Sequence, residues 1–506
     1  MTPRNIVLVY PKLGISGAMV NHLPLSILYA GVDAIKAGYD LRLEDVRLAP
    51  DGWQENLSRL IDDETLLLGI SVMTGAPIRN ALAISRWARK RYPQLAIVWG
   101  GPHATFNPEE LFLESTIDYV ISGYGSEPLA QLAKHLDNRP DALALDEIAG
   151  LSFRSGTHII SQPAKNRFEM IDFRDIPYHL IKQNLDFYGQ LDSDERIFSL
   201  YSAMGCPYKC AFCSSPAQYR NIRRKYELYS PNDIVDHIEY VQQTYGATYI
   251  YFIDDDSFVR LSHVEEIIDE IQRRRVPVKL GFRGARINEI KKMSDEFLHK
   301  LAEAGTDIMH IGAESGSQRM LDLMRKDCTV EDIVEINLKM ARHPEIKTAY
   351  NWIVALPGET MEDLIATQNL MLRLVRDNPA AILFPPNKFR PLPNTELYEI
   401  ALTMGYTRPQ NIEQWIELEN SVESACGEEL VWCSKQQLKA MDMMQVCSYF
   451  IDGKIGKVDT GKTLKYRLAA LLAWLYTPFA VFRMRTNFSS FLFEKHLVRL
   501  ASRFFN

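Results

Sequence analysis

The sequence lacks any long hydrophobic run: no apolar stretch in its 506 residues reaches the roughly 18 to 20 residues that a membrane span needs. Low-complexity segments and internal repeats are also missing, which argues against disordered, fibrous and solenoid proteins. The 57 Lys and Arg nearly balance the 64 Asp and Glu, and this mildly acidic total argues against a nucleic-acid partner. The N-terminus shows no apolar signal-peptide core, so we expect a cytoplasmic protein of several globular domains.

Cysteine is scarce, and its distribution is uneven. Seven cysteines are too few for a disulfide scaffold, and none precedes Cys206. Cys206, Cys210 and Cys213 then share one short segment, where three thiolates can hold three irons of a cubane cluster and leave the fourth iron open. Zinc is an alternative, although zinc sites usually need four ligands and the chain offers no pair of CxxC motifs. Three incidental buried cysteines are the remaining alternative.

The first part of the chain alternates strand-like and helical segments. Apolar runs that predict strands lie at 5–10, 40–46, 66–72, 95–99 and 119–122. Several of them end in glycine-rich turns, as at 100–103 and 123–127. This alternation predicts a parallel, doubly wound α/β sheet, which binds ligands beyond the carboxyl ends of its strands.

A second alternation follows a connector that contains a small hairpin. Its six predicted strands lie at 197–201, 249–253, 278–282, 308–312, 349–355 and 380–384. Six strands with crossover helices predict a partial barrel whose chemistry sits at the C-terminal strand ends. We therefore expect the following division: a doubly wound domain over 1–145, a linker over 146–195, the barrel over 196–400 and a mostly helical region over 401–506.

The C-terminal tail differs in composition from the rest of the chain. Between 454 and 506, Lys and Arg far outnumber the two acidic residues, Asp459 and Glu494. The apolar, aromatic stretch 468–482 lies among these charges and is interrupted by Pro478. It predicts either an amphipathic element on a membrane surface or a helical cap that packs on the barrel.

The segment Cys206-Pro-Tyr-Lys-Cys210-Ala-Phe-Cys213, directly after a predicted barrel strand, strongly resembles the CxxxCxxC loop of the radical SAM superfamily. Four further segments match that family in order: FIDDDSF at 252–258, IGAESGS at 311–317, VALPGET at 354–360 and PLPNTEL at 391–397. Ala355 and Asn394 depart from family glycines, but Asn tolerates left-handed backbone angles.

This resemblance implies a [4Fe–4S] cluster on Cys206, Cys210 and Cys213. In the family, the cluster binds S-adenosylmethionine (SAM) at its open iron and reduces it to release a 5′-deoxyadenosyl radical. The resemblance assigns SAM contacts to Phe212, Asp255, Asp256, Glu314 and Ser315. Taken alone, the acidic run would be a solvated turn and Glu314 a capping carboxylate.

A doubly wound domain ahead of such a barrel resembles the cobalamin-binding class of the superfamily. The resemblance implies that the following residues line a corrinoid crevice: Ser71, Thr74, Gly100, Gly101, His103, Gly123 and Gly125. The D-x-H-x-x-G signature, whose histidine ligates cobalt from below, is absent after the first strand, so we expect cobalamin without a histidine ligand. His103 is expected to position the backbone rather than to bind cobalt.

Other readings of the first domain are weaker. It could be a degenerate domain that binds no ligand, and no G-x-G-x-x-G follows its first strand to indicate a dinucleotide. The tRNA methylthiolating enzymes share the barrel but carry three more cluster cysteines in their N-terminal domain, which this sequence lacks. An auxiliary cluster on Cys426, Cys433 and Cys447 has irregular spacing, so buried free cysteines are favoured.

Two reactions fit this combination. We expect methyl transfer to an unactivated carbon, with oxidative cyclisation, as in anaerobic magnesium-protoporphyrin ester cyclases, as the alternative. A non-catalytic iron–sulfur or zinc-binding protein is the alternative from another class. The expected partners are a small, apolar substrate such as a tetrapyrrole or lipid, an electron donor such as flavodoxin or ferredoxin and, through the tail, a peripheral membrane surface.

Overall fold

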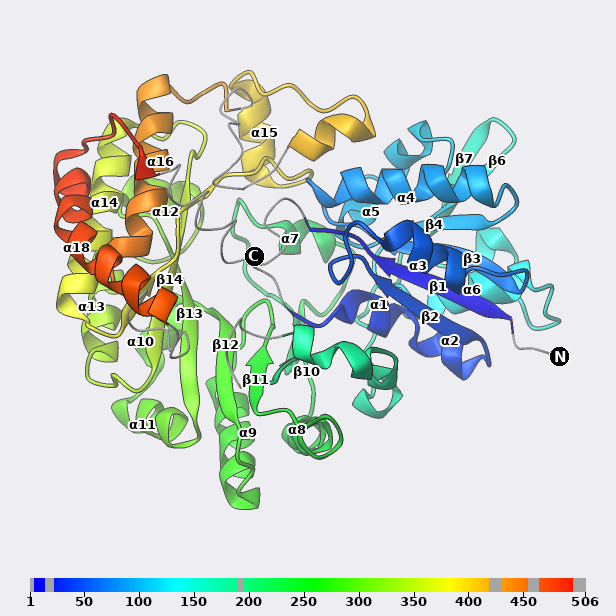
Figure 1. Cartoon of the computed structure of the whole chain (residues 1–506), viewed down its shortest axis with the longest axis horizontal. Helices are drawn as coiled ribbons and strands as arrows, with labels where there is room; N and C mark the ends of the chain where they lie inside the picture. The colour runs from blue at the N-terminus through cyan, green and yellow to red at the C-terminus, as the bar shows by residue number, and fades with distance from the viewer. Residues whose placement is uncertain (1–3, 14–21, 189–194, 418–429, 454–463, 495–506) are drawn as a thin grey trace.

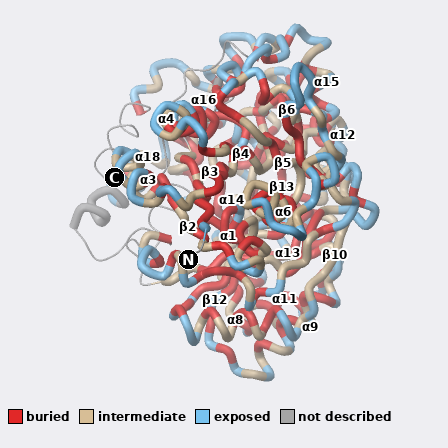
Figure 2. The backbone as a smooth tube through the Cα atoms, turned by 90° about the vertical axis from the view of Figure 1, so that its right-hand side faces the viewer, coloured by how far each residue is buried: buried red, intermediate tan, exposed pale blue. Residues whose placement is uncertain are grey.

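The computed structural model describes residues 4–13, 22–188, 195–417, 430–453 and 464–494. Two lobes lie side by side (Figure 1): a sheet domain at the N-terminus, drawn in blue and cyan, and a barrel, drawn in green and yellow. Helices of the C-terminal region, drawn in orange and red, pack on the outside of the barrel. Figure 2 shows that buried residues follow the strands in the middle of the molecule, whereas outer helices such as α9 (Leu261–Arg274) carry exposed residues.

The first sheet has the order β2-β1-β3-β4-β5-β6-β7. Its parallel strands are β1 (Asn5–Tyr10), β2 (Asp40–Asp45), β3 (Thr65–Ser71), β4 (Ala96–Gly100) and β5 (Tyr119–Ile121). The helices between them are α1 (Leu25–Ala30), α2 (Val32–Lys36), α3 (Trp53–Leu60), α4 (Pro77–Arg91), α5 (Pro102–Phe106) and α6 (Ser126–Leu136). The predicted doubly wound fold is confirmed, and its strand order reverses between β1 and β3, where such sheets bind ligands.

The first sheet extends past the boundary that the sequence predicts at residue 145. The hairpin β6 (Leu151–Ser155) and β7 (His158–Ser161), which we placed in a linker, continues this sheet in antiparallel pairing. Strand β5 would otherwise be a short, exposed sheet edge, and pairing with β6 covers its backbone groups. We use "first domain" below for residues 4–161.

The barrel has the strand order β15-β14-β13-β12-β11-β8, with every neighbouring pair parallel. Its strands are β8 (Ile197–Leu200), β11 (Tyr249–Phe252), β12 (Lys279–Ala285), β13 (Thr306–Glu314), β14 (Lys347–Val354) and β15 (Ala381–Leu383). The outer helices are α8 (Pro231–Tyr245), α9, α10 (Ile287–Lys292), α11 (Asp295–Glu303), α12 (Gln318–Leu323), α13 (Val330–Met340) and α14 (Met361–Asp377). This confirms the predicted partial barrel of six strands. Short strands β9 (Ala203–Gly205) and β10 (Tyr226–Leu228) pair separately with each other, and β16 (Asn387–Lys388) pairs in parallel with the end of β14.

Local sequence explains where the barrel helices begin and end. In α8 the Ser230 hydroxyl accepts a hydrogen bond from the backbone N–H of Asp233, and Pro231 occupies the first turn, where no N–H is needed. The helix ends at Gly246, whose φ of +71° suits a residue without a side chain. These two caps define where α8 begins and ends, and therefore where the chain turns back toward the next strand.

The C-terminal region is helical, as predicted, with α15 (Glu396–Thr403), α16 (Lys435–Ile451) and α18 (Leu464–Thr486). A short 3₁₀ segment, η6 (Ile412–Glu417), crosses back to the first domain, where the Trp415 indole donates to Glu110 Oε1 at 3.2 Å. Among the described residues, no helix has the length and apolarity that crossing a membrane requires. Much of the predicted basic tail, 454–463 and 495–506, lies outside the described residues.

Candidate functional site

A cavity of about 310 Å³ lies between the first domain and the barrel. The carboxyl ends of β3 and β4 and the turn after β5 form one wall. The opposite wall comes from the barrel and includes Tyr201, Ile253, Asp255 and Arg283, together with Tyr219 of the segment after α7 (Ser214–Gln218). The two sets of parallel strand ends thus face each other across one space, which is where both folds place their ligands.

Glycines leave the first-domain wall open. A Cβ added to Gly100 or Gly125 would meet no protein atom closer than 3.8 Å or 3.7 Å, respectively, so side chains there would project into free space. Gly101 has a different role, because its φ is +91° and a Cβ would lie 2.9 Å from the backbone nitrogen of Val72. A wall without side chains lets a large planar group approach the backbone, which fits a corrin ring.

The structure separates the predicted cobalamin residues into two groups. Those that line the cavity are Ser71, Gly100, Gly101, Gly123 and Gly125. Thr74 and His103 are buried beneath this wall, where the Thr74 hydroxyl lies 3.1 Å from His103 Nδ1 and the imidazole packs against Trp415. Burial lowers the pKa of His103 to about 4, so the ring is neutral. Among the described residues, no histidine lines the cavity.

The cysteine loop, residues 206–213, follows β9 at the mouth of the barrel, and its three thiols are half-buried and free of disulfides. The Arg286 guanidinium donates to Cys210 Sγ at 2.8 Å and lies over the Tyr208 ring. Burial raises the pKa of Cys206 to about 12 and also raises that of Cys213. Thiolates in this loop therefore need a compensating positive charge, which Arg286 supplies.

No three His, Cys, Asp or Glu side chains within the described ranges converge as ligands of one metal ion would. A cubane cluster makes a different demand, because each cysteine binds its own iron and the sulfurs stand around the cluster rather than around one point. The chemistry of three thiols beside a buried cation fits such a cluster.

A buried ion pair supports the loop from the far side. Lys326 Nζ donates to Glu314 Oε1 at 3.0 Å, and both side chains are almost completely buried. Glu314 has a φ of +63°, and Arg286 donates to the Lys326 carbonyl at 2.7 Å. The predicted SAM residue Glu314 is thus paired, and Ser315 is buried with its hydroxyl 3.2 Å from that of Thr367.

The acidic run after β11 contains three side chains with different surroundings. Asp254 accepts from the backbone N–H groups of Ser202 and Ala203 and holds the chain ahead of the cysteine loop. Asp255 faces the cavity and accepts from the Tyr219 hydroxyl at 2.9 Å.

Asp256 is turned toward the cysteine loop. It is buried, one of its carboxylate oxygens has no hydrogen-bond partner, and burial together with nearby Glu289 raises its pKa. Phe212 is half-buried and packs against the core. The cysteines and these predicted SAM residues therefore surround the barrel mouth, and their roles stay predictions.

Sequence reasoning missed several charged and polar residues of this site: Tyr208, Tyr219, Arg283, Arg286 and Lys326. A signal for two of them was present, because Arg283 and Arg286 lie in or directly after a strand whose other residues beyond Lys279 are small or apolar. Charged side chains in such a strand must point into a cavity or find a partner. Lys326 gave no comparable signal.

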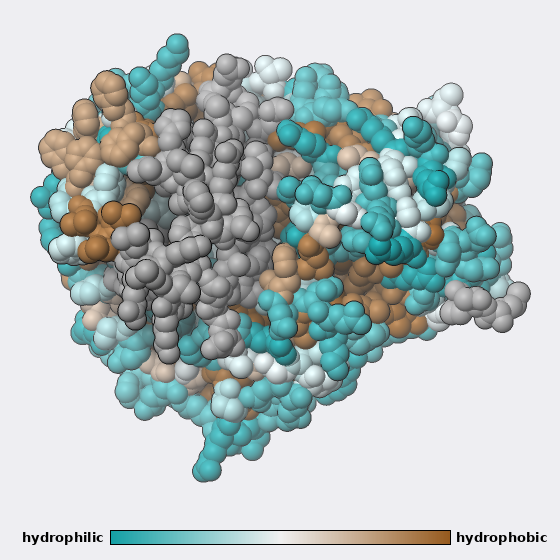
Figure 3. Space-filling model, in the orientation of Figure 1, coloured by the Kyte–Doolittle hydropathy of each residue, from teal (hydrophilic) through white to brown (hydrophobic). Residues whose placement is uncertain are grey.

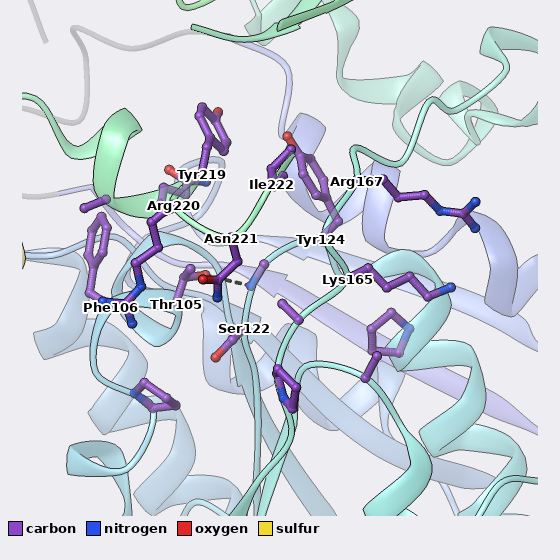
Figure 4. A pocket seen from close by; sticks show the side chains of 18 of the residues that line it. Thr105, Phe106, Ser122, Tyr124, Lys165, Arg167, Tyr219, Arg220, Asn221 and Ile222 are labelled. Carbon is purple, nitrogen blue, oxygen red and sulfur yellow. Dashed lines mark hydrogen bonds between the residues drawn. The ribbon is translucent and has the colours of Figure 1, made fainter. Parts of the chain in front are cut away.

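A smaller pocket of about 160 Å³ adjoins the cavity behind Tyr124 (Figure 4). Lys165, Arg167 and Arg220 lie around it, and Lys165 pairs with Glu127. The Thr105 hydroxyl accepts from the backbone N–H of Gly123 at 3.0 Å and holds the turn that separates the two spaces.

Two family models match the chain where these sites lie. The B12 binding domain matches residues 18–133, and the radical SAM superfamily matches residues 200–371. The first range contains the glycine wall, and the second contains the cysteine loop together with the buried Glu314–Lys326 pair.

Known proteins of this kind are similar over most of the chain. The anaerobic magnesium-protoporphyrin IX monomethyl ester cyclase of Cereibacter sphaeroides is 27% identical over 76% of this chain, which spans 63% of that relative's length. An uncharacterized methyltransferase of Pyrococcus horikoshii is 24% identical over 78% of this chain and 83% of its own.

The radical SAM methyltransferase TsrM of Kitasatospora setae, solved with cobalamin and a [4Fe–4S] cluster, has the same fold. Its TM-score is 0.63 at 20% identity, over 80% of this chain and 79% of that one. The chain therefore belongs to the radical SAM proteins that carry a B12-binding domain ahead of the barrel.

Proposed function

We propose that the protein is a cobalamin-dependent radical SAM enzyme that transfers a methyl group to an unactivated carbon of a small molecule. The observation that carries this proposal is the single cavity that joins the glycine wall of the first domain to the barrel mouth beside the cysteine loop. When bound, the cluster supplies the electron that cleaves SAM, and cobalamin supplies the methyl group.

The chain's own residues hold and orient these groups. We assign the cluster to Cys206, Cys210 and Cys213, with Arg286 balancing the charge of the thiolates. Asp255 lies where it can accept a hydrogen bond from a SAM amino or hydroxyl group in the cavity. The first domain covers the barrel mouth, so a reactive intermediate formed there is shielded from water.

We also propose that the cobalt has no histidine ligand below it. His103 supports this assignment because its ring is held by Thr74 and Trp415 beneath the wall rather than presented to the cavity. A corrinoid spectrum of the reconstituted protein with and without the substitution His103→Gln tests it, since loss of a cobalt–nitrogen ligand would shift the bands.

An oxidative cyclase is the second candidate. The similarity to the anaerobic magnesium-protoporphyrin IX monomethyl ester cyclase favours it, because that relative aligns over 76% of this chain. The two reactions differ in what becomes of the SAM methyl group, so one labelling experiment distinguishes them.

The test is anaerobic reconstitution with iron, sulfide and hydroxocobalamin, followed by incubation with methyl-deuterated SAM and candidate substrates. Methyl transfer predicts both 5′-deoxyadenosine and S-adenosylhomocysteine, with the label in a product heavier by one methyl group. A cyclase predicts 5′-deoxyadenosine and an unlabelled, oxidised product. Absence of SAM cleavage in protein that shows intact cluster and corrin bands would contradict both proposals.

Two partners belong to this proposal. An electron donor such as flavodoxin or ferredoxin must reduce the cluster.

A membrane surface is the second partner, because α18 carries an exposed apolar ridge. This ridge consists of Leu471, Leu472, Trp474, Leu475, Phe479 and Phe482. Hydrophobic side chains gather over this part of the molecule (Figure 3, upper left). Trp474 is 69% exposed, which suits an aromatic ring at a lipid interface.

A further inference from the structure

Aromatic and imidazole rings from several elements lie near Arg283, which lines the cavity. The rings of Tyr251 on β11 and His22 of the first domain stack at 5.2 Å. His310 on β13 lies 5.8 Å from Tyr251 and 5.1 Å from Phe384. The imidazole of His22 is also held by the Ser199 hydroxyl on β8, 3.2 Å from Nδ1. These rings pack face to face and edge to face, with interplanar angles of 9° to 81°, and form one cluster of neutral rings.

Arg283 on β12 places a positive charge beside this ring cluster. Its side chain is exposed, and it is the only cation among the described residues that line the cavity. Within the described ranges, no Asp or Glu carboxylate lies within 4.0 Å of its guanidinium. Asp255, on the same wall, is already engaged by Tyr219 and Ser215.

The surroundings leave the charge of Arg283 uncompensated. Burial, together with the charge of Arg283, lowers the pKa of His22 and of His310 to about 4, so both rings are neutral near pH 7. Arg286, three residues further on, is by contrast engaged by Cys210 and by the Lys326 carbonyl. Arg286 is thus used by the cysteine loop, while Arg283 faces the cavity.

We propose that Arg283 binds a carboxylate of the substrate, and that the substrate's planar, apolar body lies against Tyr251 and His310. A guanidinium presents two parallel N–H groups that match a carboxylate, and the partly enclosed cavity strengthens this contact. Aromatic rings supply stacking surface for the planar part. This inference rests on the proposed function. It narrows the expected substrate from an apolar molecule to an apolar molecule that also carries an anionic group.

A carboxylate at Arg283 has two sources: the substrate, or the methionyl group of SAM. The placement of Arg283 favours the substrate. The groups near Arg283 are Tyr201, Tyr251, His22 and His310. The arginine beside the cysteine loop, where SAM is expected to bind, is instead Arg286. The experiment therefore measures SAM binding separately.

The test uses the protein reconstituted with iron, sulfide and hydroxocobalamin, and two probes of the same shape, 2-naphthoate and its neutral amide 2-naphthamide. Binding of each is measured by titration calorimetry at saturating SAM. The variants are Arg283→Gln and the charge-retaining Arg283→Lys, with Arg260→Gln, at the exposed start of α9, as the matched surface control.

We expect the wild-type protein to bind 2-naphthoate at least about tenfold more tightly than 2-naphthamide, as a charge-assisted hydrogen bond provides. Arg283→Gln should abolish this preference, Arg283→Lys should retain part of it, and Arg260→Gln should retain all of it. SAM affinity and the corrin bands should be the same in all four proteins.

Equal or undetectable binding of the two probes by the wild-type protein would overturn the inference, as would an unchanged preference in Arg283→Gln. Weakened SAM binding or lost corrin bands in that variant would also overturn it, because Arg283 would then serve a cofactor. The preference is measured without turnover, so failure of the proposed reaction is seen separately as absent SAM cleavage.

Discussion

The two walls of the cavity are built on opposite principles. The wall of the first domain combines glycines at the strand ends with mostly apolar side chains, and its glycines leave space for a ligand beside the backbone. The barrel wall and the cysteine loop behind it carry buried charges, and the polar atoms there that lack a hydrogen-bond partner include Asp256 Oδ2, Glu289 Oε2 and Arg286 Nε. One wall selects its ligand by shape, whereas the other is arranged to hold charge.

Because the two walls hold their ligands in different ways, we expect a substitution on one wall to leave the cofactor of the other wall bound. The largest effect is expected for Cys210→Ala, which removes a cluster thiolate and the sulfur that accepts a hydrogen bond from Arg286. The [4Fe–4S] absorption and 5′-deoxyadenosine formation should be lost, while cobalamin stays bound. Cys433→Ala, outside the cysteine loop, is the control and should keep both cofactors. Simultaneous loss of cobalamin from the Cys210 variant would show that the walls are not independent.

The converse change is Gly100→Val. The new side chain would project into the cavity, so we expect cobalamin affinity to fall at least about tenfold through steric exclusion, with the cluster bands unchanged. Corrin absorbance after gel filtration measures this. Gly52→Val, at the start of α3 and away from the cavity, should bind cobalamin normally. Full occupancy in Gly100→Val would argue against this wall as the corrinoid site.

Lys326→Met tests the charged wall for stability. Glu314 would be left buried without its partner, and loss of one member of such a pair costs about 3–5 kcal/mol in the free energy of unfolding. Urea unfolding measures the change. The double variant Lys326→Met with Glu314→Gln should recover most of the loss, and a single variant as stable as the wild type would contradict the role of the pair.

Acidification tests the layer beneath the glycine wall. The pKa of His103 is lowered by burial to about 4, whereas that of an unfolded histidine is about 6.5. The unfolded chain therefore takes up the proton first, and stability that is complete above pH 6.5 is lost as the pH falls toward 4, at about 1.4 kcal/mol per pH unit. In unfolding experiments between pH 7 and 5, the stability of His103→Gln should fall less steeply with pH than that of the wild type. Equal slopes of stability against pH would show that His103 does not contribute to the loss.

The smallest effect is expected outside both walls. Replacing Trp474 and Leu475 by serine removes two exposed side chains of the apolar ridge, so pelleting with anionic vesicles should drop a few-fold. Cofactor content and SAM cleavage should not change. Unchanged pelleting would remove the membrane surface from the proposed partners.

The sequence predicted those parts of the site that depend on neighbours along the chain. The cysteine loop and the glycines at the strand ends are local, since their role follows from spacing and backbone shape. Thr74 and His103 were expected in the crevice but lie beneath it, because their surroundings include Trp415, which no local pattern could place.

Two other features depended equally on distant partners. The charge of Lys326 is explained only by its pairing with Glu314, and the hairpin β6–β7 joins the first sheet because the edge of β5 needed cover. For the suggested auxiliary cluster, Cys426 lies outside the described residues, and Cys433 and Cys447 are free thiols.

The contact of η6 with the first domain has a consequence for synthesis on the ribosome. Trp415 and its partner Glu110 are 305 positions apart, so the side of the first domain that carries His103 stays uncovered until the barrel has also been made. At about 5–20 residues per second, this exposure lasts roughly 15–60 s. The nascent first domain would therefore present an incomplete surface to chaperones for most of translation, and truncation before residue 415 would leave that surface open permanently.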